Sequence, residues 1–364
     1  MSPADVSYVA FIASSNLMRA RLFALADRHM ERRVSRRWQG VRMVSISIQA
    51  NLRDARSWSA LAQRCEAAGF DALLAPDHPG TAASPFVALA AAASVTKRIG
   101  LGSYVSHAGV REPLLLASDV ATLDVVSHGR ARLAMGAGHT PVEWAMLGSS
   151  RPDVAGRVQR FMAMAEACRA LLAGDEVTVD GPYVCARAAR LDSPRPVQSR
   201  VPFTFGGGNS ALLRWAGRHA DVVALSGLGR TLGDGHSHET RWRGDDIDRQ
   251  VELIEQGAAG RKAAPPREAL VQVVEITDDA EVAAHRLADR FGSTERDVLS
   301  SPYAWIGTEG EILEALADHE RRWGITRYVV REPALEAAEN LITRLHRGSG
   351  VAGRPSQPTT ESTA

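Results

Sequence analysis

The sequence predicts an α/β fold of the (β/α)8 barrel type. Apolar runs rich in β-branched residues, suited to strands buried on both faces, alternate along the chain with amphipathic helical stretches. Eight such strands occur, each followed by at least one helix, which is the count that a barrel requires. The competing doubly wound sheet is disfavoured because no G-x-G-x-x-G follows the first strand, where a dinucleotide-binding fold would carry it.

The elements follow one another with some regularity. The predicted strands are 41–48, 71–75, 99–105, 131–135, 201–205, 221–225, 270–276 and 328–330. Local signals support the helices between them: Gly69 is a C-cap signal after the first, and Pro85 opens the second. The predicted helices are 58–67, 85–95, 113–126, 157–172, 210–219, 246–256, 281–291, 309–323 and 334–345.

Two connections are too long to be simple loops. Residues 173–200 contain two short alternating pieces around Asp180-Gly181, which predicts a β-hairpin. Residues 227–244 are rich in Gly and His and have no periodicity, and we expect them to cover the substrate as a lid. Within them, His236-Ser237-His238 lacks a third ligand nearby, so no metal site is expected.

The ends of the chain read differently from the barrel, which we assign to residues 41–346. Residues 1–40 form an N-terminal extension in which five arginines crowd one short segment: Arg28, Arg32, Arg33, Arg36 and Arg37. A basic surface helix is the favoured interpretation of this segment, and a partner-binding arm or a misassigned start codon are the others. Residues 347–364 are mainly Gly, Pro, Ser and Thr, which predicts a disordered tail.

Composition excludes several classes of protein. Of the 364 residues, 43 are Lys or Arg and 42 are Asp or Glu, so the net charge of +1 gives no electrostatic footprint for nucleic acid or anionic membrane. The three cysteines are widely spaced and form no CxxC pair or disulfide framework, which favours a reducing cytoplasm. The longest apolar run, 88–95, is too short to span a bilayer, and no secretory signal is evident.

In a barrel the chemistry lies where strands end, so these positions are the candidate site. Asp77-His78 follows the second strand, and an acid beside an imidazole can position the ring and relay a proton. Ordinary turn chemistry is the alternative, and the dipeptide alone favours it. After the fourth strand, Gly136 and Gly138 would let a planar ring approach the backbone, or would simply turn the chain before His139.

A run of three glycines, Gly206-Gly207-Gly208, stands between the fifth strand and a helix that begins after Asn209. Exposed N–H groups and the positive end of a helix dipole together form a phosphate site. The alternative is a flexible turn with Asn209 or Ser210 as the cap. We favour the phosphate site.

Several motifs together resemble one family. Gly100-Leu101-Gly102, Arg111-Glu112-Pro113 and Gly136-Ala137-Gly138 surround Thr122–Arg130 (TLDVVSHGR), which is close to the motif TLD-x-x-S-x-GR of the bacterial-luciferase-like superfamily. The second half matches at Phe205-Gly206-Gly207-Gly208, Ala216–Asp221, Ser301-Pro302 and Ile306-Gly307-Thr308. The combination is most similar to the actinobacterial branch of coenzyme F420-dependent oxidoreductases, over about residues 41–346.

The resemblance implies a TIM barrel, often dimeric, that binds a flavin or deazaflavin ring at its C-terminal mouth. Asp77 and His78 match an acidic–His pair that faces the reactive edge of the ring. Ser106 and His107 fall where members carry a bulge, often with a non-proline cis peptide, that backs the ring. The remaining matches are Gly136 and Gly138 along the ring, Gly206, Gly207, Gly208 and Asn209 at the phosphate loop, and Glu143, which supports the ring-side loop.

One residue departs from the family pattern. Some sugar-oxidising members carry a glutamate acid directly after the Gly-x-Gly of the fourth strand, where this chain has His139. The departure argues against a sugar-phosphate dehydrogenase and leaves His78 and His139 as the proton-transfer candidates. Arg111, and with it Arg214 or Arg218, could meet the anionic side of the cofactor; solvated ion pairs are at least as good an interpretation.

The expected function is therefore that of a cytoplasmic oxidoreductase, a homodimer, that moves a hydride between reduced coenzyme F420 and a small organic substrate. Reduction of an activated C=C or C=N bond, with His78 or His139 protonating the product and Asp77 beside them, is the specific expectation. A monooxygenase using reduced FMN and oxygen is the first alternative. A cofactor-free barrel that serves as an interaction scaffold is the second.

Overall fold

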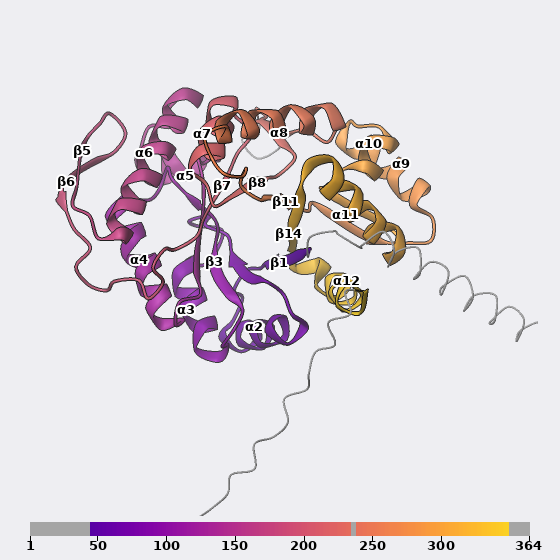
Figure 1. Cartoon of the computed structure of the whole chain (residues 1–364), viewed down its shortest axis with the longest axis horizontal. Helices are drawn as coiled ribbons and strands as arrows, with labels where there is room; N and C mark the ends of the chain where they lie inside the picture. The colour runs from indigo at the N-terminus through magenta and orange to yellow at the C-terminus, as the bar shows by residue number, and fades with distance from the viewer. Residues whose placement is uncertain (1–43, 234–237, 349–364) are drawn as a thin grey trace, which may run out of the picture. The chain divides into compact units, whose positions relative to one another are not determined.

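Eight parallel strands close into a barrel in the computed structural model, which describes residues 44–233 and 238–348 (Figure 1). Each strand pairs in parallel with its two neighbours, and the last strand returns to the first. In the order around the barrel, the strands are β1 (Ser45–Gln49), β2 (Ala72–Ala75), β3 (Gly100–His107), β4 (Ala131–Gly136), β7 (Phe203–Gly206), β8 (Val222–Leu225), β11 (Arg267–Leu270) and β14 (Ile325–Arg331). The predicted (β/α)8 barrel is confirmed.

Helices surround the strands (Figure 1). Local signals set their ends: for the first helix, Asp54 Oδ1 accepts hydrogen bonds from the backbone N–H groups of Arg56 and Ser57, and Gly69 ends the helix in the left-handed conformation at φ 88°. The helices are α2 (Ala55–Ala68), α3 (Pro85–Val95), α4 (Pro113–Val126), α5 (Pro141–Met146), α6 (Val154–Ala173), α7 (Ser210–His219), α8 (Gly244–Ala258), α9 (Ala280–Phe291), α10 (Glu295–Ser300), α11 (Glu309–Trp323) and α12 (Leu335–Gly348), with a 3-10 turn at Glu332–Ala334.

In the described ranges, three small two-stranded sheets lie outside the barrel sheet. The antiparallel pair β5 (Val177–Asp180) and β6 (Cys185–Ala189) is the hairpin predicted in the first long connection. The second long connection contains a pair that the sequence did not indicate, β9 (Leu228–Thr231) with β10 (His238–Thr240).

The third small sheet corrects the prediction for the seventh strand. The run 270–276 divides between β11, which belongs to the barrel, and β12 (Val273–Ile276), which pairs with β13 (Ala304–Gly307). The barrel strand begins earlier than predicted because its first two residues, Arg267 and Glu268, are buried charged residues that an apolar pattern cannot reveal.

Inside the barrel, small and large residues alternate around one apolar layer. Ala72, Ala134 and Ala224 leave room for Tyr104 and Leu270, and all five are buried. On the N-terminal side of this layer lies a set of charged residues, here named the barrel floor: Asp71, Arg132, Glu268 and Arg327. The opposite, C-terminal end of the strands is the mouth, where the candidate residues lie.

The barrel floor is an ion-pair network. Arg132 donates to both carboxylate oxygens of Asp71 at 2.6 and 3.0 Å, and Arg327 donates to Asp71 Oδ2 at 2.6 Å. Arg327 Nε also lies 3.6 Å from Glu268 Oε2. Burial raises the pKa of Glu268 despite the charge of Arg327, whereas Asp71 keeps a lowered pKa because its two arginines outweigh its burial.

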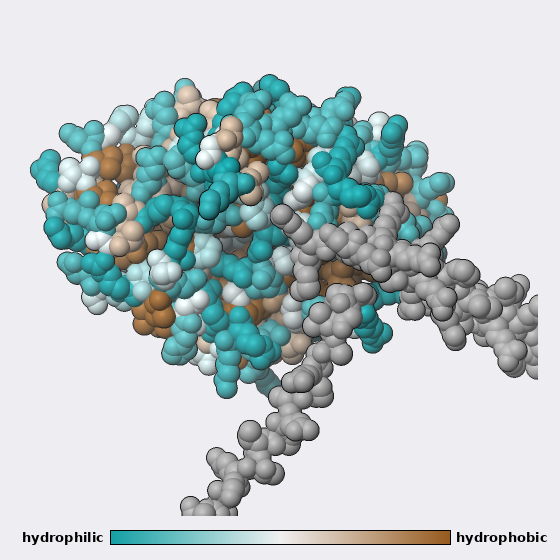
Figure 2. Space-filling model, viewed as in Figure 1, coloured by the Kyte–Doolittle hydropathy of each residue, from teal (hydrophilic) through white to brown (hydrophobic). Residues whose placement is uncertain are grey.

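Residues on the viewed face are mainly hydrophilic, with small groups of apolar residues among them (Figure 2). None of the helices in the described part of the chain has the length and apolar character that crossing a bilayer needs. The predicted extension 1–40 lies outside the described residues. So does the predicted tail, except that residues 347 and 348 are the last of α12.

Candidate active site

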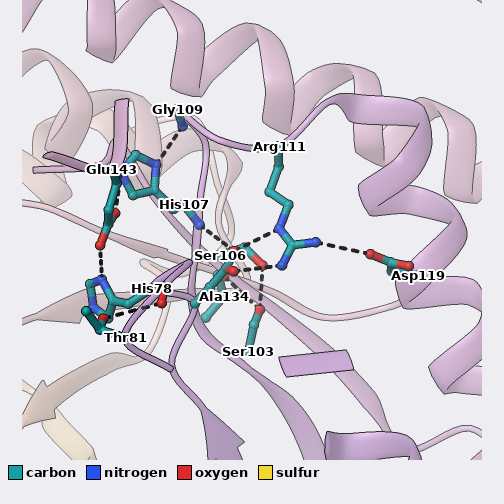
Figure 3. A network of polar contacts seen from close by, with 11 residues as sticks. His78, Thr81, Ser103, Ser106, His107, Gly109, Arg111, Asp119, Ala134 and Glu143 are labelled. Atoms are coloured by element: carbon teal, nitrogen blue, oxygen red, sulfur yellow. Dashed lines mark hydrogen bonds and ion pairs between the residues drawn. The ribbon is translucent and has the colours of Figure 1, made fainter. Parts of the chain in front are cut away.

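The carboxylate of Asp77, directly after β2, is buried and fully engaged. Asp77 is 2% exposed. Its Oδ2 accepts from the His107 backbone N–H at 3.1 Å and from Arg111 Nε at 3.0 Å, and its Oδ1 accepts from Arg111 Nη2 at 2.7 Å. Arg111 also reaches Asp119 at 3.4 Å (Figure 3). The described structure therefore pairs Arg111 with carboxylates, and Asp77 fixes the end of β3.

The end of β3 carries the bulge that the resemblance implied. The register with β4 shifts between Ser103 and Ser106, and the peptide bond between Tyr104 and Val105 is cis, two residues before the expected pair Ser106-His107. The Ser106 hydroxyl donates to Ser103 Oγ at 2.8 Å, and Ser103 Oγ donates to the Ala134 carbonyl at 3.2 Å (Figure 3). The side chain of Ser106 thus braces the bulge.

Glu143, on the short helix α5, lies between two imidazoles (Figure 3). Its Oε1 is 2.7 Å from His78 Nδ1, and its Oε2 is 3.1 Å from His107 Nε2, an ion-pair distance without hydrogen-bond alignment. The Gly109 backbone N–H donates to His107 Nδ1 at 2.9 Å, so a neutral His107 carries its proton on Nε2, toward Glu143. Three residues from three separate segments therefore form one array.

The array leaves one ring nitrogen available. Burial would raise the pKa of Glu143, but its close contacts with His107 and His78 lower it, so Glu143 is a carboxylate at neutral pH. A carboxylate only accepts hydrogen bonds, so His78 Nδ1 must donate to it. His78 Nε2 has no hydrogen-bond partner among the described residues, and the side chain is 39% exposed. His78 therefore has the geometry of a proton-transfer residue.

His139 lies beside His78 in a row of rings. The ring centroids of His139 and His78 are 5.9 Å apart, and those of His139 and His238 are 4.7 Å apart. Enclosure by protein atoms, with the neighbouring His238 and His78, lowers the pKa of His139 to about 4, although part of its side chain is open to solvent. His139 is neutral at pH 7 and is a poorer acid than its position suggested.

His238 belongs to the long connection for which the sequence predicted no strand or helix, but strand β10 places it against His139. Its neighbours His236 and Ser237 lie outside the described residues. No group of three or more His, Cys, Asp or Glu side chains in the described ranges has the arrangement of a metal site. The row of His78, His139 and His238 thus depends on the pairing of β9 with β10. The local sequence around each histidine does not reveal it.

Gly136, at the end of β4, and Gly138, in the loop after it, allow the end of β3 to pack closely against β4. A Cβ on Gly138, where φ is +78°, would lie 1.9 Å from His107 Cε1, and one on Gly136 would lie 2.7 Å from Val105 Cγ2. Trp144 packs edge-on against His107 with centroids 5.8 Å apart and is 4% exposed. Both glycines thus let the bulged end of β3 meet β4; a direct role toward a cofactor ring stays a prediction.

The glycine run after β7 stands at the start of α7. Asn209 Oδ1 accepts from the backbone N–H groups of Ala211 and Leu212, so the Asn209 side chain caps the helix. The backbone N–H groups of Gly207 and Gly208 make no hydrogen bond to any described residue. Arg214, one turn further along α7, donates to Gln256 of α8 at 3.0 Å and to the Ser210 carbonyl at 3.5 Å.

Comparison with known proteins agrees with this geometry. The model of the luciferase-like monooxygenase family matches residues 39–357. The chain belongs to the luciferase-like monooxygenase family. Two curated relatives are an F420-dependent glucose-6-phosphate dehydrogenase of Beutenbergia cavernae, 35% identical over 189 residues (50% of this chain, 54% of the relative), and a 5,10-methylenetetrahydromethanopterin reductase of Methanopyrus kandleri, 30% identical over 148 residues (38% and 42%). The chain spans about half the length of the curated relatives it matches.

Solved structures of luciferase-like proteins share the fold. The coenzyme F420-dependent tetrahydromethanopterin reductase of Methanopyrus kandleri superposes with a TM-score of 0.64 at 20% identity, over 85% of this chain and 99% of that chain. A long-chain alkane monooxygenase superposes with a TM-score of 0.66 at 14% identity, over 87% and 94%. At these identities the likeness concerns the barrel alone.

Proposed function

We propose that this chain is an oxidoreductase that transfers a hydride between coenzyme F420 and a small organic substrate, reducing an activated C=C or C=N bond. The observation that carries the proposal is His78, held by Glu143 with one free ring nitrogen at the mouth of the barrel. F420-dependent enzymes among the curated relatives support the choice of cofactor.

The glycine run fits the phosphate-bearing part of such a cofactor. The N–H groups of Gly207 and Gly208 are unpaired within the described structure and precede the positive end of α7. A Cβ on Gly208 would touch only the Leu228 carbonyl oxygen, at 3.5 Å, so the space beside this residue is open. These two backbone groups and the start of α7 would hold the phosphate, while the Asn209 side chain holds the helix.

The residues at the mouth would donate the proton that the reduction requires. Reduced F420, when bound, supplies the hydride that one atom of the substrate double bond accepts. In doubly protonated His78, Nδ1–H stays with Glu143, and Nε2–H is the proton that the other atom of the double bond can take. His78 then regains a proton from solvent, to which it is partly open. Neutral His139 would orient His78 and the lid residue His238 rather than act as the acid.

The first experiment is a fluorescence titration of the purified protein with F420 and with FMN, each oxidised and reduced. Tight binding of F420 with weak binding of FMN is the expected result. The reverse preference would support the monooxygenase reaction found among structural relatives. Binding of neither cofactor would overturn both enzyme hypotheses and favour the scaffold.

A variant pair locates the cofactor. Gly208→Asp fits the backbone without a clash and would place a carboxylate beside the expected phosphate, so it should weaken F420 binding at least tenfold. Gly260→Asp, at an exposed glycine with open space around it, is the matched control and should change nothing. Equal affinity of both variants for F420 would remove the phosphate assignment.

We also propose a homodimer in the cytoplasm. Two large apolar side chains are exposed on neighbouring helices, Val87 (71%) on α3 and Leu115 (67%) on α4, and burial of both against a second copy would remove them from water. Sedimentation of the wild type against Val87→Lys tests the pairing: a dimer that becomes a monomer supports it, and a monomeric wild type contradicts it.

A further inference from the structure

Strand β14 places arginine side chains at both ends of the barrel interior. Val329 belongs to the buried interior layer, and side chains alternate along a strand, so Arg327 and Arg331 also face inward. Arg327 lies in the barrel floor. Arg331 is the last residue of β14 and pairs in register with Gln49, the last residue of β1, so it stands at the mouth.

The surroundings of Arg331 hold it in place without neutralising it. Arg331 Nη2 donates to Gln272 Oε1 at 3.1 Å, and Gln272 Nε2 donates to the Ser226 carbonyl at 2.9 Å, which fixes the amide orientation. Within residues 44–233 and 238–348, no carboxylate lies at ion-pair distance from Arg331, and its other N–H groups have no hydrogen-bond partner. A guanidinium has five such donors, so four remain for a ligand.

The other interior and mouth arginines differ on this point. Arg111 and Arg132 each form a two-point contact with an aspartate, and that contact raises the pKa of each against the effect of burial. Around Arg331, burial is the largest influence and lowers its pKa, while the side chain stays open to solvent at the mouth. Arg331 is still a full positive charge at neutral pH, because arginine is not deprotonated in proteins.

Strand order separates Arg331 from the phosphate loop. β14 is three strands from β7, which carries the glycine run, but only two strands from β2, which leads to His78. An anion bound at Arg331 would therefore extend toward His78 from the side of the mouth away from the expected cofactor phosphate.

We propose that Arg331, steadied by Gln272, binds an anionic oxygen group of the substrate, a carboxylate or a phosphate, and so selects acidic substrates for the reaction at His78. The inference rests on the proposed oxidoreductase function. Its physical basis is that a guanidinium forms paired, charge-assisted hydrogen bonds with such groups, and that these bonds are stronger than neutral ones.

Calorimetric titration of the full chain tests the site without turnover. The probes are benzoate against benzamide and phenyl phosphate against phenol, with and without oxidised F420. The wild type should bind at least one anion ten to a hundred times more tightly than its neutral partner. Arg331→Met should abolish that difference, Arg331→Lys should keep part of it, and Arg187→Met, at an exposed residue of the β5–β6 hairpin, should keep all of it. The stronger anion identifies carboxylate or phosphate as the group.

Three outcomes would overturn the inference: no preference for anions in the wild type, a preference that survives in Arg331→Met, or a tenfold loss of F420 affinity in Arg331→Met with anion binding intact. The last would assign Arg331 to the cofactor. Failure of the wild type to bind F420 or FMN would instead contradict the proposed function. The anion preference of the free protein could still be measured in that case, so the two failures are distinguishable.

Discussion

The two ends of the barrel both carry charged side chains, but they use them in opposite ways. At the floor, Asp71 receives Arg132 and Arg327, and each arginine ends on a carboxylate. At the mouth, His78 Nε2 and most of the Arg331 donors have no partner among the described residues. A buried charge needs a charged partner, as at the floor, whereas a polar group open to solvent can stay hydrated until a ligand replaces the water, as at the mouth. This difference distinguishes the floor, which stabilises the fold, from the mouth, which is open to a ligand.

The sharpest test of this comparison removes the open nitrogen at the mouth. His78→Ala should lower turnover with F420 by about 10²–10⁴-fold, the usual contribution of a positioned acid or base. Affinity for F420 should change little, whereas the unfolding midpoint should fall modestly, because the buried Glu143 loses its hydrogen bond from His78. His285→Ala is the control, since that histidine pairs with Glu295 on the outer surface. Full activity of His78→Ala would retire it as the proton donor.

A matched change at the floor should affect stability instead. Asp71→Ala leaves Arg132 and Arg327 without their shared carboxylate, and we expect the free energy of unfolding to fall by about 3 kcal/mol. Glu176→Ala, which breaks the exposed pair with Arg190, should cost less than about 1 kcal/mol. Chemical denaturation measures both. Similar losses for the two variants would show that the floor does not depend on its ion pairs.

The histidine row predicts a pH effect of known sign. The pKa of His139 is lowered to about 4, below its ordinary value of 6.5, so between these values the unfolded chain binds a proton that the folded chain does not. His139 therefore costs stability as the pH falls from 6.5 to 4, and His139→Gln should show a shallower loss of melting temperature over that window.

His285 is the control with the opposite sign. Its hydrogen bond to Glu295 raises its pKa, so it contributes stability that is present at acidic pH and is lost as the pH rises through its folded pKa. His285→Gln should therefore lower the melting temperature at acidic pH, where His139→Gln raises it. Parallel shifts of the two variants would show that His139 does not stay neutral in the folded protein.

The sequence predicted the elements that depend on local pattern. Helices α3 and α7 have the predicted bounds, because Pro85 starts the first and Asn209 caps the second. Seven barrel strands lie close to where apolar runs placed them, and the strand that was misplaced, β11, opens with Arg267 and Glu268. A buried charge is acceptable only beside a partner that closure of the barrel supplies, which no local pattern encodes.

The candidate site shows the same limit. The positions at the strand ends could be read from the sequence, but the contacts could not: Glu143 meets two histidines that lie 65 and 36 residues away along the chain. The interpretation of Arg111 as a partner of the cofactor did not anticipate Asp77, which the fold brings to it. The sequence did not indicate Arg331 as a site residue, because its neighbours along the chain do not distinguish it from a surface arginine.

The smallest expected effect is that of removing the Ser106 hydroxyl, and it tests whether this group has a structural role or contacts the cofactor. The hydroxyl is buried and donates a hydrogen bond to Ser103 Oγ, which is typical of a structural role. The family resemblance instead implies that it lies beside the cofactor. Ser106→Ala should lower the free energy of unfolding by about 0.5–1.5 kcal/mol, the net value of one hydrogen bond, and leave F420 affinity within about twofold. Ser94→Ala, on an exposed hydroxyl of α3, should change neither quantity. If Ser106→Ala weakens F420 binding tenfold instead, the hydroxyl acts at the mouth, and bracing of the bulge is not its main role.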